Sequence, residues 1–241
     1  MMLFADASGA FNDESSCAAG QIHFFKKHAG SFDAPVFDVG AHHGSYALEL
    51  RKFLKPEIPI FCFEPHPLTF KVLQANLASV ANMHALNMAA GNVNGKSNLF
   101  DGSGFGRRGS PLASSYRGVI ESLHNMEAET YEIDMLILDD FCSSKGISRI
   151  SLLKIDVEGG ELDVLKGFSE YVSAGKIDFI NFEFHEMNVI SRVFFRDFWE
   201  MLSPKYAIYR LIPGGMIELR EYKAFYCEIF GYQNILAKLK K

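Results

Sequence analysis

Residue types suited to ligand binding gather where a short apolar run near the start of the chain gives way to glycines. The run Val36–Val39 contains Asp38 and leads directly into the turn Gly40–Gly44, which reads Gly-Ala-His-His-Gly. Because glycine has no Cβ, such a turn brings backbone amides and the start of the next helix against a ligand. The residues that we expect to contact a bound cofactor here are Asp38, Gly40, His42 and Gly44.

An acid at the end of the next apolar run narrows the choice of ligand. Glu64 directly follows the run 58–63 and comes 26 residues after Asp38 (64 − 38). In doubly wound sheets an acid at this place accepts hydrogen bonds from the ribose hydroxyls of a nucleoside. The alternative is a surface acid at a strand end. Taken with the glycine turn, Glu64 indicates a ligand that contains adenosine.

The spacing of the glycines distinguishes two cofactors that contain adenosine. A dinucleotide site needs G-x-G-x-x-G, whereas this turn has only Gly40 and Gly44, with His42 at the place of the second glycine. S-adenosylmethionine carries no phosphate, and Asp38 suits its cationic methionyl part. The sequence therefore favours S-adenosylmethionine, with a nicotinamide-dependent oxidoreductase as the alternative.

Charged residues also follow the apolar run 151–157. Lys154 and Asp156 are two residues apart, so they share one face of a strand near its carboxyl end, where open α/β sheets bind ligands. We interpret Asp156, Lys154 and Glu158 as candidate catalytic residues, with Lys154 orienting the acceptor or acting as a base if its pKa is lowered. Glu161 is better explained as an acid that stabilises the first turn of the next helix.

A third pair of candidates ends the apolar run 177–184. Glu183 and His185 share a face and should lie near Asp156 if the two strands are neighbours. Histidine, with a pKa near neutrality, could remove a hydroxyl proton, or it could be a hydrogen-bonded structural residue. We place Glu183 against the acceptor. These acids could also hold a divalent cation, but we do not predict a metal.

The order of apolar runs predicts an α/β fold. Strand-like runs alternate with helical patterns, which is typical of a mostly parallel sheet with helices on both faces. No helix is expected between the last runs, so they must pair antiparallel as a C-terminal hairpin. The runs expected as strands are 36–39, 58–63, 84–89, 151–157, 177–184, 206–212, 216–219, 224–230 and 234–239.

Size and charge restrict the organisation and the partners of the chain. Its 241 residues suit one main domain, which we assign to residues 36–241, with residues 1–35 as an N-terminal helical cap. A net charge of −5 gives no field that would attract nucleic acid or a membrane surface. The four cysteines form no CxxC pair, and with no signal-peptide pattern we expect a cytoplasmic protein.

Residues 101–118 are rich in glycine and serine, and we expect an irregular segment that covers the site. Long loops within compact domains are more often functional than not. The residues of this segment that we expect to contact a hydroxylated acceptor are Arg107, Arg108, Ser114 and Ser115, although the arginines could simply be solvated.

These motifs together resemble the FkbM family of S-adenosylmethionine-dependent methyltransferases. The resemblance rests on residues 37–44, 63–67, 136–141 and above all 153–167, where Leu-Lys-Ile-Asp-Val-Glu-Gly stands close to the pattern of the family. It implies a Rossmann-like seven-stranded methyltransferase fold with a reversed final strand. At the position of His42 the family commonly has asparagine.

The resemblance also implies roles for single residues. It places Asp38, Gly40 and Gly44 on S-adenosylmethionine, Glu64 on its ribose and Asp156 at the centre of methyl transfer. We expect Pro65, Asn87 and Ala89 to contact the cofactor as well. The family mostly methylates hydroxyl groups, often of sugars, so we predict an O-methyltransferase of a sugar or another polyhydroxylated small molecule. A non-catalytic cofactor-binding homologue is a further alternative.

Overall fold

An eight-stranded sheet forms the centre of the protein in a computed structural model that describes residues 14–103 and 110–241. The strand order is β10-β9-β11-β8-β7-β1-β2-β3, and the five strands from β8 to β3 are parallel. The strands of the parallel part are β1 (Val36–Val39), β2 (Ile60–Phe63), β3 (Met83–Leu86), β7 (Ile150–Ile155) and β8 (Ile177–Phe184).

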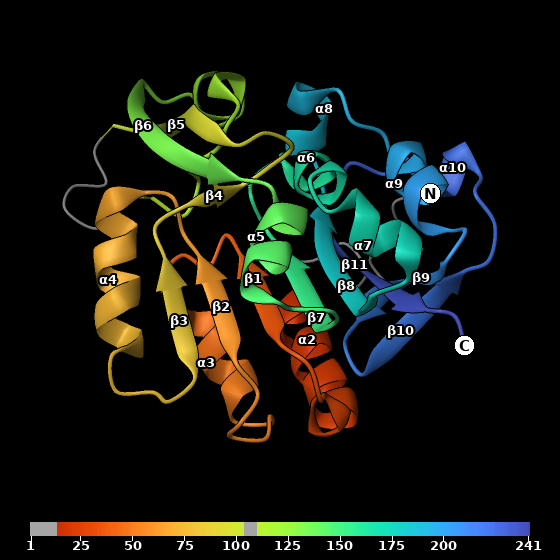
Figure 1. The fold of residues 1–241 in the computed structure, drawn as a ribbon. Helices are drawn as coiled ribbons and strands as arrows, with labels where there is room; N and C mark the ends of the chain where they lie inside the picture. Colours follow the sequence, from red (N-terminus) through yellow and green to blue (C-terminus); the bar gives the residue numbers. More distant parts are fainter. Residues whose placement is uncertain (1–13, 104–109) are drawn as a thin grey trace.

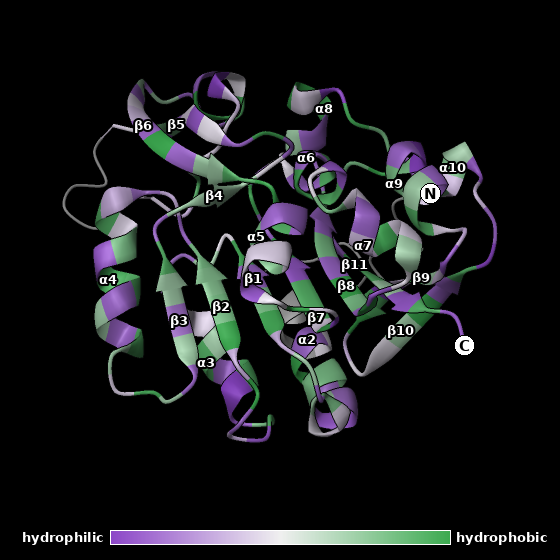
Figure 2. Ribbon diagram, viewed as in Figure 1, coloured by the Kyte–Doolittle hydropathy of each residue, from purple (hydrophilic) through white to green (hydrophobic). Residues whose placement is uncertain are grey.

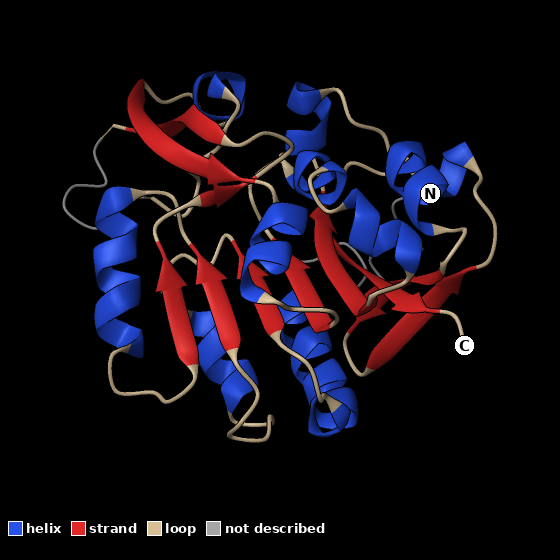
Figure 3. Cartoon of the chain, in the orientation of Figure 1, coloured by secondary structure: helices blue, strands red, loops and turns tan. Residues whose placement is uncertain are grey.

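The C-terminal strands reverse direction, as the sequence predicts. β11 (Gln233–Leu239) lies antiparallel between β8 and β9 (Tyr206–Ile212), and β10 (Gly215–Leu219) pairs with the outer side of β9. The predicted α/β class, with a mostly parallel sheet and an antiparallel end, is confirmed (Figure 3). β10 is the strand that brings the sheet from seven strands to eight, because the turn at residues 213–214 folds it back onto β9.

Helices cover both faces of the sheet, and each face has its own hydrophobic core. The helices on one face are α2 (Glu14–His28), α3 (Ser45–Arg51) and α4 (Pro67–Leu77). Those on the other are α5 (Leu138–Lys145), α6 (Glu161–Lys166), α7 (Ser169–Ala174) and α9 (Phe195–Leu202). Three further helices are short: α8 (Met187–Ser191), α10 (Ala224–Cys227) and η1 (Ala29–Ser31).

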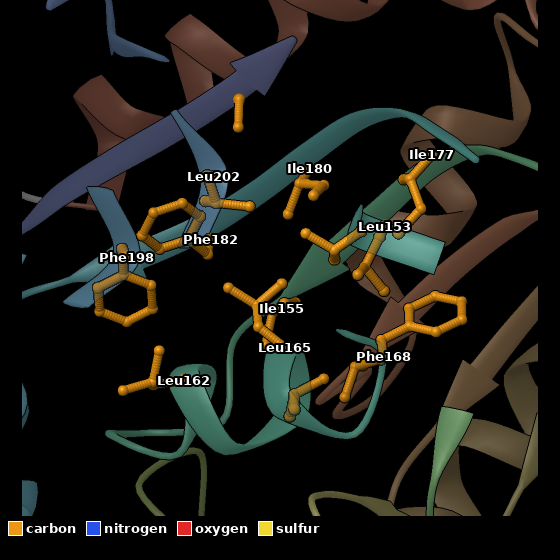
Figure 4. Close-up of a cluster of buried hydrophobic side chains, with 14 of the residues drawn as sticks. Leu153, Ile155, Leu162, Leu165, Phe168, Ile177, Ile180, Phe182, Phe198 and Leu202 are labelled. Atoms are coloured by element: carbon orange, nitrogen blue, oxygen red, sulfur yellow. The ribbon is translucent and has the colours of Figure 1, made fainter. Parts of the chain in front are cut away.

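Alternation along the strands assigns side chains to the two cores. In β7, Leu152 packs toward α2 and α3, whereas Leu153 and Ile155 pack toward α6 (Figure 4). The strands are therefore apolar over most of their length (Figure 2), as expected for a sheet buried on both sides. Phe182 of β8 stacks on Phe198 of α9 with ring centroids 4.6 Å apart, which fixes that helix on the sheet.

A second, three-stranded sheet lies beyond the carboxyl ends of the parallel strands (Figure 1). β5 (Gly95–Gly102) and β6 (Ala128–Leu136) are antiparallel, and β4 (Ala89–Ala90) pairs with β6. The sequence analysis missed β5 and β6, because most of their side chains are at least partly exposed and give no apolar run. The segment predicted as irregular begins with the end of β5 and leads to a single π-helical turn, η3 (Val119–Leu123).

The predicted strand at residues 224–230 is wrong, because its first half is the one-turn helix α10. Glu228 Oε2 accepts a hydrogen bond from Phe195 N at 2.7 Å, and Oε1 accepts one from Arg196 N at 2.9 Å. This carboxylate caps the first backbone amides of α9, which have no partner within the helix. The segment therefore folds against the start of α9 instead of forming a strand.

The N-terminal helix α2 contacts β9 and β10, so the two ends of the chain pack together. Residues 1–13 lie outside the described part, and the division at residue 35 stays a prediction. Across the described residues, none of the helices combines the length and the apolar character that crossing a bilayer requires.

Candidate active site

A row of buried polar side chains crosses the sheet on the face that α2 and α3 cover. Register places Asp38 of β1 beside Lys154 of β7, and Lys154 beside Asn181 of β8. The Lys154 ammonium lies 3.3 Å from Asp38 Oδ1 and 3.1 Å from Asp156 Oδ2, and donates to the Gly40 carbonyl at 3.2 Å. It also lies 5.2 Å from the centre of the Tyr46 ring. One buried cation therefore links the glycine turn to the carboxyl end of β7.

The surroundings of Lys154 favour its charged form. Although burial alone lowers the pKa of a lysine, the carboxylates of Asp156, Asp38 and Glu183 together raise the pKa of Lys154 above its ordinary value. Asp38 is fully buried, and burial raises its pKa while Lys154 opposes the rise. The condition under which Lys154 was expected to act as a base is not met, and orienting other groups is the role left to it.

The glycine turn fits against β7 with no room for a side chain. Gly40 has φ +77°, and a Cβ there would lie 1.7 Å from the Asp156 carbonyl oxygen. The amides of Gly40 and Ala41 both donate to the Phe63 carbonyl at 3.0 Å. Gly44 has φ +85°, and a Cβ would lie 2.8 Å from Leu73 Cδ1. The turn thus joins β1, β2 and β7 at their carboxyl ends.

Glu64 holds the other side of the turn. Its Oε2 accepts from His42 N and its Oε1 from His66 N, both at 2.9 Å, and burial raises the pKa of this carboxyl to about 7. His42 has φ +47°, a left-handed conformation that histidine and asparagine adopt more readily than most residues. Burial, with His43 alongside, lowers the pKa of His42 to about 4, so its imidazole is neutral.

A cavity of about 660 Å³ lies above this turn, between the carboxyl ends of the strands and the small sheet. Its size falls within the range of small-molecule sites. Its walls combine the apolar ends of β1 and β2 with acids and hydroxyl groups. The residues predicted as site residues that border it are Gly40, His42, Glu64, Pro65, Ala89, Ser115, Lys154, Asp156, Glu158 and Glu183.

Other predicted residues lie behind the wall. Asn87 donates through Nδ2 to the carbonyls of Glu64 and Pro65, both at 2.9 Å, and so supports the ribose candidate rather than facing the cavity. Ser114 is fully buried and donates to the Glu158 carbonyl at 2.7 Å. Asp38 and Gly44 likewise do not border the cavity but lie next to residues that do. Arg107 and Arg108 lie outside the described residues.

His185 also lies behind the wall, next to Glu183. Its Nε2 is 3.8 Å from Glu183 Oε2, and burial lowers the pKa of the imidazole, so His185 is neutral. Glu183 itself is buried, borders the cavity, and accepts from the Tyr232 hydroxyl at 2.5 Å. Contact with an acceptor would therefore reach Glu183 before His185.

Gln21, Tyr46 and Tyr232 are among the cavity residues that were not predicted from the sequence. Gln21 of α2 and Tyr232, just before β11, border the cavity although 211 positions separate them in the chain (232 − 21). Gln21 Nε2 donates to Asn234 Oδ1 at 3.1 Å, which links the two ends. Tyr46, the second residue of α3, is the only one of the three with a sequence signal, which is its closeness to Gly44.

Glu161 stabilises the turn that carries Glu158. Its Oε1 accepts from Val157 N and Gly159 N, both at 3.1 Å, while burial raises the pKa of its carboxyl to about 7. A carboxyl whose pKa is higher in the folded than in the unfolded protein contributes stability below the unfolded value. That contribution is lost as pH rises through about 7.

We expect Glu161→Gln to flatten this pH dependence, because the amide oxygen can accept both hydrogen bonds without titrating. Between pH 5 and 8 the wild-type free energy of unfolding should fall by up to about 3 kcal/mol more than that of the variant. Urea denaturation at several pH values measures both slopes. Parallel curves for the two proteins would contradict the assigned pKa of Glu161.

A comparison with protein families identifies the chain. Residues 38–211 match the methyltransferase FkbM domain. The chain belongs to the FkbM methyltransferase family. It is thus an S-adenosylmethionine-dependent methyltransferase, and the nicotinamide-dependent alternative falls away. The matched range contains every residue of the polar row from Asp38 to Glu183.

Three curated FkbM relatives show how far the similarity reaches. The 2-O-methyltransferase NoeI of Sinorhizobium fredii is 28% identical over 76% of this chain and 72% of its own length. The hexuronic acid methyltransferase AglP of Haloferax volcanii is 25% identical over 64% of this chain, and the 31-O-demethyl-FK506 methyltransferase FkbM of Streptomyces tacrolimicus 31% over 56%. The matches span 56% of AglP and 59% of FkbM, less than two thirds of each relative.

Solved structures agree on the fold. A putative O-methyltransferase from Klebsiella pneumoniae superposes with a TM-score of 0.50 at 11% sequence identity, covering 98% of this chain and 86% of the other. At that identity the likeness establishes the Rossmann-like methyltransferase fold and leaves the acceptor open.

Proposed function

We propose that this FkbM-family protein transfers the methyl group of S-adenosylmethionine to a hydroxyl of a sugar or another polyhydroxylated small molecule. The main support for this proposal is that one cavity is lined both by Glu64, the ribose candidate, and by acids and hydroxyl groups that include Asp156 and Tyr232. The names of NoeI and AglP, an O-methyltransferase and a methyltransferase of a sugar acid, support an acceptor of this class.

The residues around the cavity fit the cofactor. Glu64 borders the cavity, and its two carboxylate oxygens, which each accept one backbone amide, have further lone pairs for ribose hydroxyls. The tight turn at Gly40 leaves backbone rather than side chain against the ligand. Met88 and Ala89 give an apolar wall at the end of β3 for a flat base. When bound, S-adenosylmethionine supplies an electrophilic methyl group on a sulfonium.

The protein supplies alignment and a proton acceptor. We assign Asp156 as the group that accepts the hydroxyl proton, because it borders the cavity and is fixed by Lys154 at 3.1 Å. Lys154 is a positioning residue, since its ammonium holds Asp156 and Asp38 and stays charged. Most of the rate enhancement then comes from the alignment of the hydroxyl oxygen with the methyl group.

Glu64→Ala tests the cofactor assignment. At pH 8, above the raised pKa of Glu64, we expect the variant to bind S-adenosylhomocysteine more weakly by about 1.5–3 kcal/mol, because it loses hydrogen bonds from the ribose to a charged carboxylate. Titration calorimetry measures the change, and Glu57→Ala, which removes an exposed acid, is the control. Unchanged affinity in a folded Glu64→Ala protein would refute ribose binding at this residue.

Methyl transfer itself is tested with labelled S-adenosylmethionine and a panel of glycosides. We expect labelled O-methyl products from wild type and none from Asp156→Ala. Cofactor binding without transfer to any hydroxylated acceptor would instead support the non-catalytic alternative.

A further inference from the structure

The acceptor end of the cavity carries more negative charge than its one lysine can balance. Asp156, Glu158 and Glu183 all border the cavity here, and Lys154 is the single cationic side chain among the described residues of its wall. The lysine already faces Asp38 at 3.3 Å and Asp156 at 3.1 Å. Among the described residues, Glu158 and Glu183 therefore have only a share of this one lysine, which already pairs with two other acids.

Glu158 is the clearest sign of a missing partner. Its Oε2 atom is buried and accepts no hydrogen bond from the described residues, although the residue borders the cavity. The backbone holds it there: Glu158 has φ +54°, and its carbonyl accepts from Ser114 Oγ at 2.7 Å. A buried carboxylate oxygen without a donor is costly, so a ligand that brings a donor would be favoured.

Glu183 has donors of its own, but they are neutral. The Tyr232 hydroxyl lies 2.5 Å from Oε1, and the neutral imidazole of His185 is 3.8 Å from Oε2. Burial raises the pKa of both Glu158 and Glu183, and the Asp156 carboxylate raises each further. Lys154 lowers both pKa values but does not cancel the effects of burial and of the neighbouring carboxylates.

We propose that Glu158 and Glu183 form a cation-binding subsite beside the transferred methyl group, and that the acceptor is a hydroxylated molecule bearing an amine, such as an amino sugar. The inference rests on the proposed function and adds the charge of its acceptor. An ammonium donates to carboxylate oxygens through charge-assisted hydrogen bonds, while an anionic acceptor would meet three acids in a partly buried wall.

The first test uses cofactor analogues that differ in charge at the methyl position. Sinefungin has an amine on carbon where S-adenosylmethionine has its methyl sulfonium, and S-adenosylhomocysteine is uncharged there. We expect sinefungin to bind wild type about tenfold more tightly than S-adenosylhomocysteine, and the preference to shrink severalfold in Glu158→Gln and Glu183→Gln. Glu200→Gln, which removes an exposed acid of α9, is the charge-matched control and should keep the full preference.

The second test adds acceptor-like probes to the protein saturated with S-adenosylhomocysteine. Glucosamine should raise the thermal midpoint more than glucose, and glucuronate should give the smallest shift. The amine effect should be lost in both glutamine variants, two independent positions that keep the test decisive if one variant fails to fold. Glu183→Gln keeps an oxygen for the Tyr232 hydroxyl.

The outcomes distinguish a failure of the proposed function from a failure of the cation-binding subsite. Failure to bind S-adenosylhomocysteine at all would contradict the proposed function. If the protein binds S-adenosylhomocysteine normally, three results would each overturn the cation-binding subsite alone. They are equal affinity for sinefungin and S-adenosylhomocysteine, no thermal shift from glucosamine, and a thermal shift from glucuronate equal to that from glucosamine.

Discussion

Gly40→Ala is expected to destabilise the protein by more than about 4 kcal/mol, a loss that few single substitutions reach. Two causes add. The residue has φ +77°, where an L side chain costs about 1–2 kcal/mol. The new Cβ would also lie 1.7 Å from the Asp156 carbonyl oxygen, so the β1–β7 pairing must open at the site itself.

Gly214→Ala separates these two causes. Gly214 has φ +78°, nearly the same conformation, but no atom lies within 4 Å of the position of its Cβ. This control should cost only the conformational part, about 1–2 kcal/mol. Urea denaturation of both variants measures the difference, and S-adenosylhomocysteine binding should be lost only in Gly40→Ala. Equal losses of stability would show that the turn does not press against β7.

Lys154→Met is expected to cost about 3–5 kcal/mol of stability, the range for breaking a buried ion pair from one side. The substitution leaves Asp38 fully buried beside no cation. Its carboxyl must then take up a proton, so the loss should be smaller at low pH, where protonation costs less. Methionine keeps most of the side-chain volume against Tyr46, so packing contributes little to the effect.

A double-mutant cycle isolates the ion pair. Asp38→Asn removes the charge that Lys154 balances, and the double variant should be about 1–3 kcal/mol more stable than the sum of the two single effects predicts. Denaturation of the four proteins at one pH measures this coupling. Additive losses would mean that Asp38 and Lys154 do not depend on each other, and that the polar row is not an electrostatic unit.

Local sequence predicted the part of the site that neighbouring parallel strands build. Asp38, Lys154 and Asp156 could be placed together because each stands at the end of a recognisable strand, and parallel strands share an edge. Glu64 and the glycine turn followed from the same rule. The confirmed family resemblance rests on these same stretches, which explains why the fold and the methyl donor could be predicted together.

The rest of the site depends on contacts that local sequence does not encode. Gln21 and Tyr232 meet only because α2 packs on the C-terminal strands. Glu158 was predicted as a site residue, but the φ of +54° that its backbone adopts could not be predicted from the sequence. The role of Asn87 behind Glu64 likewise appears only once β2 and β3 are paired. Charge at the acceptor end is therefore a property of the fold.

A crystal structure of the complex with S-adenosylhomocysteine tests the central claim most directly. The account predicts both ribose hydroxyls within hydrogen-bonding distance of the Glu64 carboxylate, with the sulfur facing Asp156 in the same cavity. A ribose bound elsewhere, or a sulfur turned away from Asp156, would contradict it.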